Sequence, residues 1–421
     1  MSTTLHNKRV PALGRLWSMF GTGSWDRSPS NPKLKCDDDD ENSSKSLTLQ
    51  RPLLPAGSVM GNISTVIYLL WEFSKNDIFT FSLPCTIFGV ALSLAKEATT
   101  TPSTPSLGQV LSRLPAICLF QLYSLLLFDL ANQRHPIAVA EDLINKPWRP
   151  IPSGKITSDQ TRRLFLCLVP IAMALNYALG VWHEGLLVLI VIFVYNDLGC
   201  ADEPVFRDIL LGISYGIYHV GSLRIALGLG QHAQREAGIN VSMADVISAR
   251  GYAWTAIVSA LIATMISIQD LKDQDGDRAR GNRTTIPLLI GETASRYQLA
   301  ATALTWAVVG VVFWKTPVWY AAPFVGFAGY IAWRLLARRN KVDDEVTWRN
   351  WCRWTMMVYS LPALYSRRTS YMHSLLVDYD SDDRSFHSRE RHLTGIQYRT
   401  TCFHSAGSKQ ASNATWQILP M

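Results

Sequence analysis

Charged residues are scarce in this sequence. Asp, Glu, Lys and Arg make up 17% of the 421 residues, whereas ordinary soluble domains contain about 25%. The charges gather at the two ends of the chain and in a few short clusters, and between Asp77 and Tyr365 long apolar stretches recur. Such stretches are long enough to cross a bilayer. This distribution excludes a soluble cytosolic enzyme and a disordered scaffold, and it predicts a protein that crosses the lipid bilayer several times.

The sequence also lacks three familiar patterns. Its 7 cysteines include no CxxC pair, so we interpret them as small core residues rather than as a disulfide framework or a zinc site. No apolar segment near the N-terminus has the form of a cleaved signal peptide, and we expect membrane insertion to start at the first internal span. No soluble basic domain accounts for the net charge of +7, because the basic residues lie in loops between apolar segments. We therefore expect no nucleic-acid partner.

Nine apolar segments lie between the two polar ends, and none alternates in the way of a membrane β-barrel. We therefore predict an all-α fold, a polytopic membrane helical bundle of about nine transmembrane helices. The fourth and ninth segments are short or polar, so a count of eight also fits. The segments lie at roughly 77–96, 113–131, 162–181, 184–199, 207–229, 251–270, 297–315, 318–337 and 348–366.

Three regions follow from this pattern. Residues 1–58 are polar and predict a disordered cytoplasmic tail. Residues 59–366 form the membrane domain, in which 63–75 is expected to be an interfacial amphipathic helix before the first span. Residues 367–421 form a polar C-terminal tail to which we assign no structure.

Most Lys and Arg between the spans lie in the loops after the second, fourth, sixth and eighth segments. Basic loops stay on the cytoplasmic side of a membrane. These loops and the N-terminus are therefore predicted to face the cytosol. We expect a multi-pass protein of the endoplasmic reticulum with its active-site loops on the cytosolic side.

Two of these loops, 132–155 and 269–291, combine carboxylates with Lys and Arg next to the end of a span. In the second loop, Asp270, Asp273 and Asp277 share one helical face if the sixth span continues past its expected end. Three like charges on one face repel one another unless a cation neutralises them. The pattern therefore indicates Mg²⁺, which takes carboxylate oxygens and shares its remaining positions with phosphate.

The first loop supplies a second cluster, in which Asn132 joins Glu141 and Asp142 as a neutral oxygen ligand. Metal ions that bridge phosphate oxygens, with Lys and Arg to neutralise the remaining charge, suit a diphosphate. The alternative is solvated charge that only fixes the topology. That alternative explains the basic residues but not the aspartates beside a long apolar helix, so we favour the diphosphate site.

The apolar spans would hold a polyprenyl chain attached to such a diphosphate. Aromatic rings can face a carbocation through their π clouds, and the candidates are Phe193, Tyr195, Tyr215, Tyr218 and Trp254. Taken singly, such a ring is more often part of a core or of the membrane interface. His219 and Arg224 are unusual at membrane depth and are therefore more informative.

At these two loops the sequence resembles the UbiA superfamily of intramembrane prenyltransferases, over about residues 65–366. The first motif of that family is matched by Asn132 and by the run Arg149-Pro150-Ile151-Pro152-Ser153-Gly154. The second motif, an aspartate cluster followed by Gly, Thr and Pro, is matched by Asp270, Asp273, Asp277, Gly281, Thr285 and Pro287. The resemblance implies a helical membrane enzyme that acts on a prenyl diphosphate.

The sequence departs from the aromatic prenyltransferases in both halves. Where those enzymes have aspartates, this chain has Gln133, Pro136 and Ala140, and its acids follow at Glu141 and Asp142. After the fourth span it reads Tyr195-Asn196-Asp197-Leu198-Gly199. These differences, with the string at 141–150, resemble the fungal membrane-bound terpene cyclase branch, whose members cyclise farnesyl diphosphate instead of transferring it.

The resemblance implies a role for each group of residues. The cofactor Mg²⁺ is assigned to Asn132, Glu141, Asp142, Asp270, Asp273 and Asp277. The diphosphate is assigned to Lys146, Arg149, Lys155, Lys272 and Arg278. The substrate cavity is assigned to Phe193, Tyr195, Asn196, Tyr215, Tyr218, His219 and Trp254.

We therefore expect a terpene cyclase that makes a cyclic sesquiterpene from farnesyl diphosphate in terpenoid secondary metabolism, coupled to downstream membrane-bound tailoring enzymes. The nearest alternative is a prenyltransferase that attaches the same chain to an aromatic or polyketide acceptor. A small-solute transporter is disfavoured because the acids cluster at the membrane face and no paired interrupted helices mark a central site. A non-catalytic membrane subunit would leave both acidic clusters unexplained.

Overall fold

The computed structural model describes residues 63–99, 105–229, 246–281 and 283–365. Within these ranges the chain is helical and contains no strand, apart from an isolated antiparallel bridge between Thr99 and Ile247. The prediction of an all-α fold is therefore confirmed for this part of the chain. The predicted tails at 1–58 and 367–421 lie outside the described residues.

The described chain is a succession of helices. In chain order they are α2 (Ile63–Ser74), α3 (Leu83–Ser93), α4 (Leu107–Gln133), α5 (Pro136–Asn145), α6 (Ser158–Leu179), α7 (Trp182–Asn196), α8 (Pro204–Leu227), α11 (Ala249–Met265), α12 (Asp270–Ala279), α13 (Ile286–Ile290), α14 (Glu292–Trp314) and α15 (Val318–Ala337). A π-helical turn at Ile78–Ser82 leads into α3, and 3₁₀ turns occupy Lys96–Ala98, Cys200–Asp202 and Ile266–Gln269. Residues 341–365 are also helical.

Local sequence features explain where the long helices begin and end. Ser106 and Gln109 form a reciprocal capping box at the start of α4, and Thr157 and Gln160 do the same for α6. These pairs satisfy backbone N–H groups that have no partner inside the helix. Gly180 closes α6 in the left-handed conformation (φ 73°), which glycine adopts without steric cost. The residues at the ends of these helices therefore determine where the helices begin and end.

Helix α8 is the centre of the bundle and packs against α3, α4, α7 and α11. The helices approach closely because small residues lie at the contacts. A Cβ on Gly212 of α8 would lie 2.6 Å from the backbone oxygen of Ser259 on α11. A Cβ on Gly89 of α3 would lie 2.6 Å from the Cβ of Ser222 on α8. Larger residues at either glycine would push these helices apart.

Each of the nine predicted apolar segments coincides with a described helix. By length and composition, 5 of the described helical stretches can cross a membrane, at Leu107–Gln133, Ser158–Leu179, Pro204–Leu227, Ala249–Ala279 and Glu292–Trp314. The stretches Ile78–Ser93 and Trp182–Asn196 are apolar but shorter. The protein is therefore an integral membrane protein, and a total of nine spans remains a prediction.

Candidate active site

A cavity of about 170 Å³ lies among α4, α5, α8, α12 and the helix at 341–365. Its lining falls into two chemical groups. The charged residues that line it are Asp77, Asp129, Glu141, Asp142, Lys146, Arg149, Arg207, Asp270, Asp273 and Arg283. The aromatic residues include Phe81, Phe128, Tyr195, Tyr215, Tyr218 and Trp348.

Helices α4 and α8 set these two groups apart along the cavity. The side-chain amide of Gln121 on α4 donates to the backbone oxygen of Tyr218 and to the hydroxyl of Ser222 on α8, at 3.1 and 2.6 Å. From this contact, Asn132 lies toward the C-terminal end of α4 and Arg207 lies toward the N-terminal end of α8. Both residues line the cavity, so the two helices run antiparallel. With a rise of about 1.5 Å per residue, Arg207 and Tyr218 are separated by roughly 16 Å along the axis of α8. The cavity thus has a charged end and an aromatic end.

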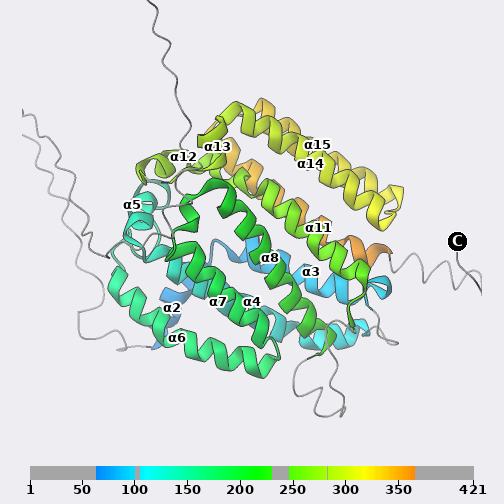
Figure 1. The fold of residues 1–421 in the computed structure, drawn as a ribbon, viewed down its shortest axis with the longest axis horizontal. Coiled ribbons are helices and arrows are strands. Elements are labelled where there is room, and N and C mark those ends of the chain that lie inside the picture. The colour runs from blue at the N-terminus through cyan, green and yellow to red at the C-terminus, as the bar shows by residue number, and fades with distance from the viewer. Residues whose placement is uncertain (1–62, 100–104, 230–245, 282, 366–421) are drawn as a thin grey trace, which may run out of the picture. The chain divides into compact units, whose positions relative to one another are not determined.

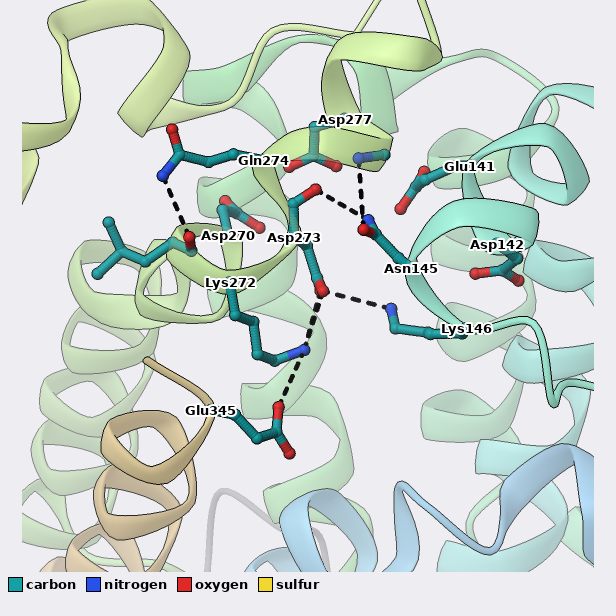
Figure 2. Close-up of polar contacts among 12 residues, drawn as sticks. Glu141, Asp142, Asn145, Lys146, Asp270, Lys272, Asp273, Gln274, Asp277 and Glu345 are labelled. Atoms are coloured by element: carbon teal, nitrogen blue, oxygen red, sulfur yellow. Dashed lines mark hydrogen bonds and ion pairs between the residues drawn. The ribbon is translucent and has the colours of Figure 1, made fainter. Parts of the chain in front are cut away.

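At the charged end, α5 and α12 pack side by side (Figure 1). Figure 2 shows Asn145 of α5 pointing at the backbone of α12: its amide nitrogen donates to the Asp273 carbonyl at 2.8 Å, and its oxygen accepts from the Gly276 N–H at 3.3 Å. A Cβ on Gly276 would lie 2.2 Å from the Asn145 nitrogen. Asn145 therefore couples the two predicted loops through a contact that only glycine permits.

Asp273 is the carboxylate at which lysines from both loops meet (Figure 2). Its oxygens lie 3.5 Å from Nζ of Lys146 and 3.0 Å from Nζ of Lys272. Lys272 also reaches Glu345 at 3.5 Å and lies 5.0 Å from the ring centroid of Trp348. Burial alone would lower the pKa of Lys146, but the carboxylates led by Asp273 outweigh burial and raise it. Lys146 is therefore a stable cation at the cavity.

Arg149 holds the carboxylate of Asp142. Its Nη1 donates to both oxygens of Asp142, at 3.0 and 2.9 Å, and its Nη2 lies 3.9 Å from Asp77. Burial disfavours the guanidinium charge, but the two aspartates outweigh it and raise the pKa of Arg149. Arg149, the first residue of the predicted motif at 149–154, therefore places a positive charge at the cavity.

Glu141 is held by two arginines from the segment after α12. Arg280 and Arg283 donate to the same oxygen of Glu141, at 3.0 and 2.9 Å. Burial would raise the pKa of Glu141, but Arg283, Lys146 and Arg280 outweigh it and lower the pKa below the ordinary value. Glu141 is therefore ionised at neutral pH.

The other two aspartates of α12 have different surroundings. Asp270 is paired at two points with Arg207 of α8, at 2.6 and 2.8 Å, and Arg207 also reaches Asp208 at 3.1 Å. Asp277 is fully buried behind the cavity lining, has no hydrogen-bond partner among the described residues, and lies 3.4 Å from Nε of Arg283. Of the three aspartates predicted on one face of α12, Asp270 and Asp273 therefore line the cavity and Asp277 lies behind its lining.

Most of the predicted metal ligands lie together. Asn132, Glu141, Asp142, Asp270 and Asp273 line the cavity, and Asn132 donates to the Asn196 side chain at 3.1 Å. In the described part of the chain, no three His, Cys, Asp or Glu side chains are already grouped for a metal ion. The donors present are carboxylate and amide oxygens, the kind that Mg²⁺ takes, and each cavity carboxylate among them lies beside Lys or Arg. These residues fit a magnesium-bound diphosphate in chemistry.

The predicted diphosphate and cavity residues divide into two sets. Lys146, Arg149, Tyr195, Tyr215 and Tyr218 line the cavity. Phe81 packs edge-on against both Tyr215 and Tyr218, with ring centroids 4.8 and 4.6 Å away. Phe81 thus joins Tyr215 and Tyr218 at the aromatic end, whereas Tyr195 lies within electrostatic reach of Arg207.

The remaining predicted residues lie outside the lining. Lys155 pairs with Glu72 at 2.7 Å, and Arg278 is exposed and bonds Gln274 at 3.1 Å. Phe193 is exposed on α7, and Trp254 is buried against Phe313 and Trp314. His219 is buried and stacked on Phe88, with ring centroids 4.1 Å apart. Asn196 and Lys272 do not line the cavity, but each contacts a residue that does, Asn132 and Asp273 respectively.

Sequence reasoning missed several residues that line the cavity. The main ones are Asp77, Asp129, Arg207, Arg283, Trp348, Trp351 and Cys352. A charge inside or at the edge of an apolar span was the available indication for Asp129 and Arg207, since such charges face a protein interior. Nothing in the sequence marks the helix at 341–365 as a wall of the same cavity.

Three comparisons place these features among known proteins. The sequence profile described as the UbiA prenyltransferase family matches residues 76–360. The chain is 28% identical over 293 residues to fumagillin beta-trans-bergamotene synthase af520 of Aspergillus fumigatus, covering 70% of this chain and 91% of that protein. It is 27% identical over 269 residues to polyprenyl transferase eriF of Hericium erinaceus, covering 62% and 83%. A UbiA homologue from Archaeoglobus fulgidus, solved with GPP and Mg²⁺, aligns at a TM-score of 0.44 and 12% identity, over 69% of this chain and 99% of that one.

Proposed function

From the premise that this chain belongs to the UbiA prenyltransferase family, we propose that it is a membrane-bound terpene cyclase that converts farnesyl diphosphate to a cyclic sesquiterpene. The observation that carries the proposal is that both motif loops supply charged side chains to one cavity, which Tyr195, Tyr215 and Tyr218 also line. A diphosphate and its hydrocarbon chain need these two environments side by side. The likeness to a bergamotene synthase favours cyclisation.

The charged end binds and stabilises the leaving group. Lys146, Arg149, Arg207 and Arg283 line it, and each is held in place by a carboxylate within 4 Å. As the bond between the prenyl carbon and the diphosphate oxygen breaks, negative charge grows on the diphosphate. Cations fixed beforehand stabilise that charge without reorganising, which lowers the barrier.

Asn132, Glu141, Asp142, Asp270 and Asp273 would hold Mg²⁺ at this end. Bound Mg²⁺ would supply Lewis acidity toward the diphosphate oxygens. Asp277, which stands behind the lining, would act on this set through Arg283. Asp142 is paired with Arg149, and Asp273 is paired with Lys146 and Lys272, so Mg²⁺ would share these carboxylates with the basic side chains.

The aromatic end would guide the cation after ionisation. Tyr195 on α7 and Tyr215 and Tyr218 on α8 line the cavity, and aromatic rings attract a cation. The apolar surroundings keep water away, which prevents capture of the cation as a simple alcohol. The active-site loops are proposed to face the cytosol from the endoplasmic reticulum membrane, where downstream tailoring enzymes would take up the product.

A prenyltransferase is the second candidate, because the chain is also similar to polyprenyl transferase eriF. Microsomes from a heterologous host that expresses the chain would be incubated with farnesyl diphosphate and Mg²⁺, with and without EDTA, and analysed by gas chromatography with mass detection. The proposal expects a cyclic hydrocarbon that EDTA abolishes. A product that forms only when an aromatic or polyketide acceptor is added would establish the transferase instead.

A further inference from the structure

We propose that Asp129 is the base that removes the final proton from the cyclised cation. The proposal rests on the proposed function, since it assigns the last step of that reaction. It concerns a carboxylate inside a membrane-spanning helix, a place where an ionisable group is expensive and therefore usually serves a function.

Asp129 lies between the two ends of the cavity. On α4, Leu125, Phe128, Asp129 and Asn132 all line it, which is the spacing of a single helix face. Asp129 is one turn from Asn132 toward the aromatic end, a step of about 4.5 Å along the helix axis. A diphosphate at the charged end would therefore leave Asp129 beside the first part of the hydrocarbon chain.

Asp129 differs from the other acids of the cavity in its contacts. Glu141, Asp142, Asp270 and Asp273 each form an ion pair at 3.5 Å or less, and Asp77 lies 3.9 Å from Arg149. Among the cavity carboxylates of the described residues, Asp129 is the one without a salt bridge. Its side chain is 4% exposed, and its Oδ2 has no hydrogen-bond partner in the same part of the chain. The carboxylate of Asp129 in the cavity wall is therefore left without an ion-pair partner.

Burial and the charge of Asp77 disfavour the ionised form of Asp129, whereas Arg149 and Lys146 favour it. Asp77, Arg149 and Lys146 are the charged groups that act on it electrostatically, from the segment before α3 and from the loop after α5. A carbocation in the cavity adds a positive charge close by, and a nearby opposite charge favours the ionised carboxylate. Tyr218, the neighbouring hydroxyl, already donates to the Ser124 carbonyl at 3.4 Å.

The step balances without a further reactant. A C–H bond next to the cationic carbon breaks, and its electron pair fills the empty orbital to form a carbon–carbon double bond. The proton goes to the carboxylate of Asp129. The cation becomes a neutral olefin and the carboxylate becomes a neutral acid, so no net charge remains in the apolar part of the cavity.

Asp129→Asn tests the assignment because it keeps the shape of the side chain and removes the basic oxygen. Diphosphate release and product profile would be measured together for farnesyl diphosphate with Mg²⁺. We expect diphosphate release within about threefold of the unaltered protein and a fall of the native cyclic hydrocarbon by roughly 100-fold or more, the usual size of a lost general base. Alcohols or isomeric olefins would replace the hydrocarbon.

Tyr123→Phe is the matched control, since Tyr123 lies on α4, bonds Asn176 and does not line the cavity. It should leave the product profile unchanged. An unchanged profile in Asp129→Asn would overturn the proposal and point to the diphosphate as the base. Loss of diphosphate release in a folded Asp129→Asn protein would also overturn it, because Asp129 would then serve ionisation.

Failure of the proposed function is distinguishable, because the unaltered protein would then release no diphosphate, and the assignment of Asp129 would fall with it. If Asp129→Asn cannot be recovered from membranes, the assignment of Asp129 is tested by chemical labelling of the unaltered protein. Dicyclohexylcarbodiimide, which labels carboxyl groups in apolar surroundings, should modify Asp129, and a non-ionising farnesyl thiodiphosphate should block the adduct. The absence of this adduct, or an adduct that the analogue does not block, would overturn the proposal.

Discussion

Arg207 and Asp270 form a two-point ion pair between the first turn of α8 and the first residue of α12, with side chains only 1% and 2% exposed. Helix α8 carries Tyr215 and Tyr218 of the cavity, and α12 carries Asp273. The pair therefore fixes the aromatic wall relative to the charged end. It is also the most buried ion pair at the site, so the loss of Arg207 would leave Asp270 as an isolated carboxylate.

Replacing Arg207 should destabilise the protein strongly. Arg207→Ala leaves Asp270 without its ion-pair partner inside the bundle, for which about 3–5 kcal/mol is expected. The measurement is thermal unfolding in detergent. Arg162→Ala is the control, because its pair with Asp159 is 53% exposed on both sides and exposed pairs contribute little, about 0–1 kcal/mol. Equal melting temperatures for the two variants would contradict a structural role for the Arg207 pair.

Asn145→Ala should weaken turnover through the position of α12. The variant removes two hydrogen bonds between α5 and α12, at 2.8 and 3.3 Å, each typically worth about 1 kcal/mol. Because the basic and acidic groups of the two loops would no longer be held in register, we expect kcat to fall by roughly tenfold or more. Gly276→Ala should give the same defect from the other side of the contact.

A purely structural role for Asn145 would lower the melting temperature and leave kcat unaltered in the folded fraction. Kinetics on protein purified by size exclusion would separate the two cases. Thr305→Ala, on the exposed face of α14, is the control and should change neither quantity.

Asp273→Ala should abolish turnover while expression is retained. Asp273 lines the cavity and gathers Lys146 and Lys272, so its loss removes a proposed Mg²⁺ ligand and the partner of two cations. Asp275→Ala is a matched control two residues away, because Asp275 is 67% exposed and faces Arg278. Diphosphate release from both variants would be compared at saturating Mg²⁺. Comparable release from the two would remove Asp273 from the metal assignment.

The two lysines that the sequence assigns to the diphosphate should behave differently. Lys146 lines the cavity, whereas Lys155 is paired with Glu72 at 2.7 Å outside it. We expect Lys146→Ala to lower kcat by about tenfold to 1,000-fold through the loss of charge stabilisation, and Lys155→Ala to stay within about threefold of the unaltered protein. Initial rates with farnesyl diphosphate would decide. A large loss in Lys155→Ala would mean that this residue moves into the cavity when the substrate binds.

The helices were predictable from the sequence because apolar segments and their caps are local properties. The segment at 63–75 corresponds to α2, and the pairing of the two loops at one cavity agrees with the positions of α5 and α12. Local patterns also indicated the carboxylates, since spacings of three and four place Asp270 and Asp273 on one helix face.

The partners of those carboxylates could not be predicted, because they come from distant parts of the chain. Arg207 reaches Asp270 across 63 positions, and Arg283 reaches Glu141 across 142. The same limit explains Lys155: a basic residue inside a motif has no sequence feature that separates a cavity-facing side chain from one that pairs with Glu72 of α2. Composition identified the aromatic residues without telling which ones face the cavity.

Tyr215 and Trp254, both assigned to the substrate cavity by the sequence, give the clearest test of that last distinction. Tyr215 lines the cavity, and Phe81 packs edge-on against it. Tyr215→Leu removes a cation–π contact worth about 0.5–2 kcal/mol, so we expect the ratio of cyclic products to shift by up to roughly tenfold or more while the melting temperature changes little. Trp254 is fully buried outside the lining, stacked 5.5 Å from Phe313, so Trp254→Ala should lose about 3–5 kcal/mol of stability and keep the native product ratio. Product profiles by gas chromatography and melting curves in detergent would be recorded for both. A changed profile in Trp254→Ala at a temperature where the variant is folded would show that the cavity extends to α11 during the reaction.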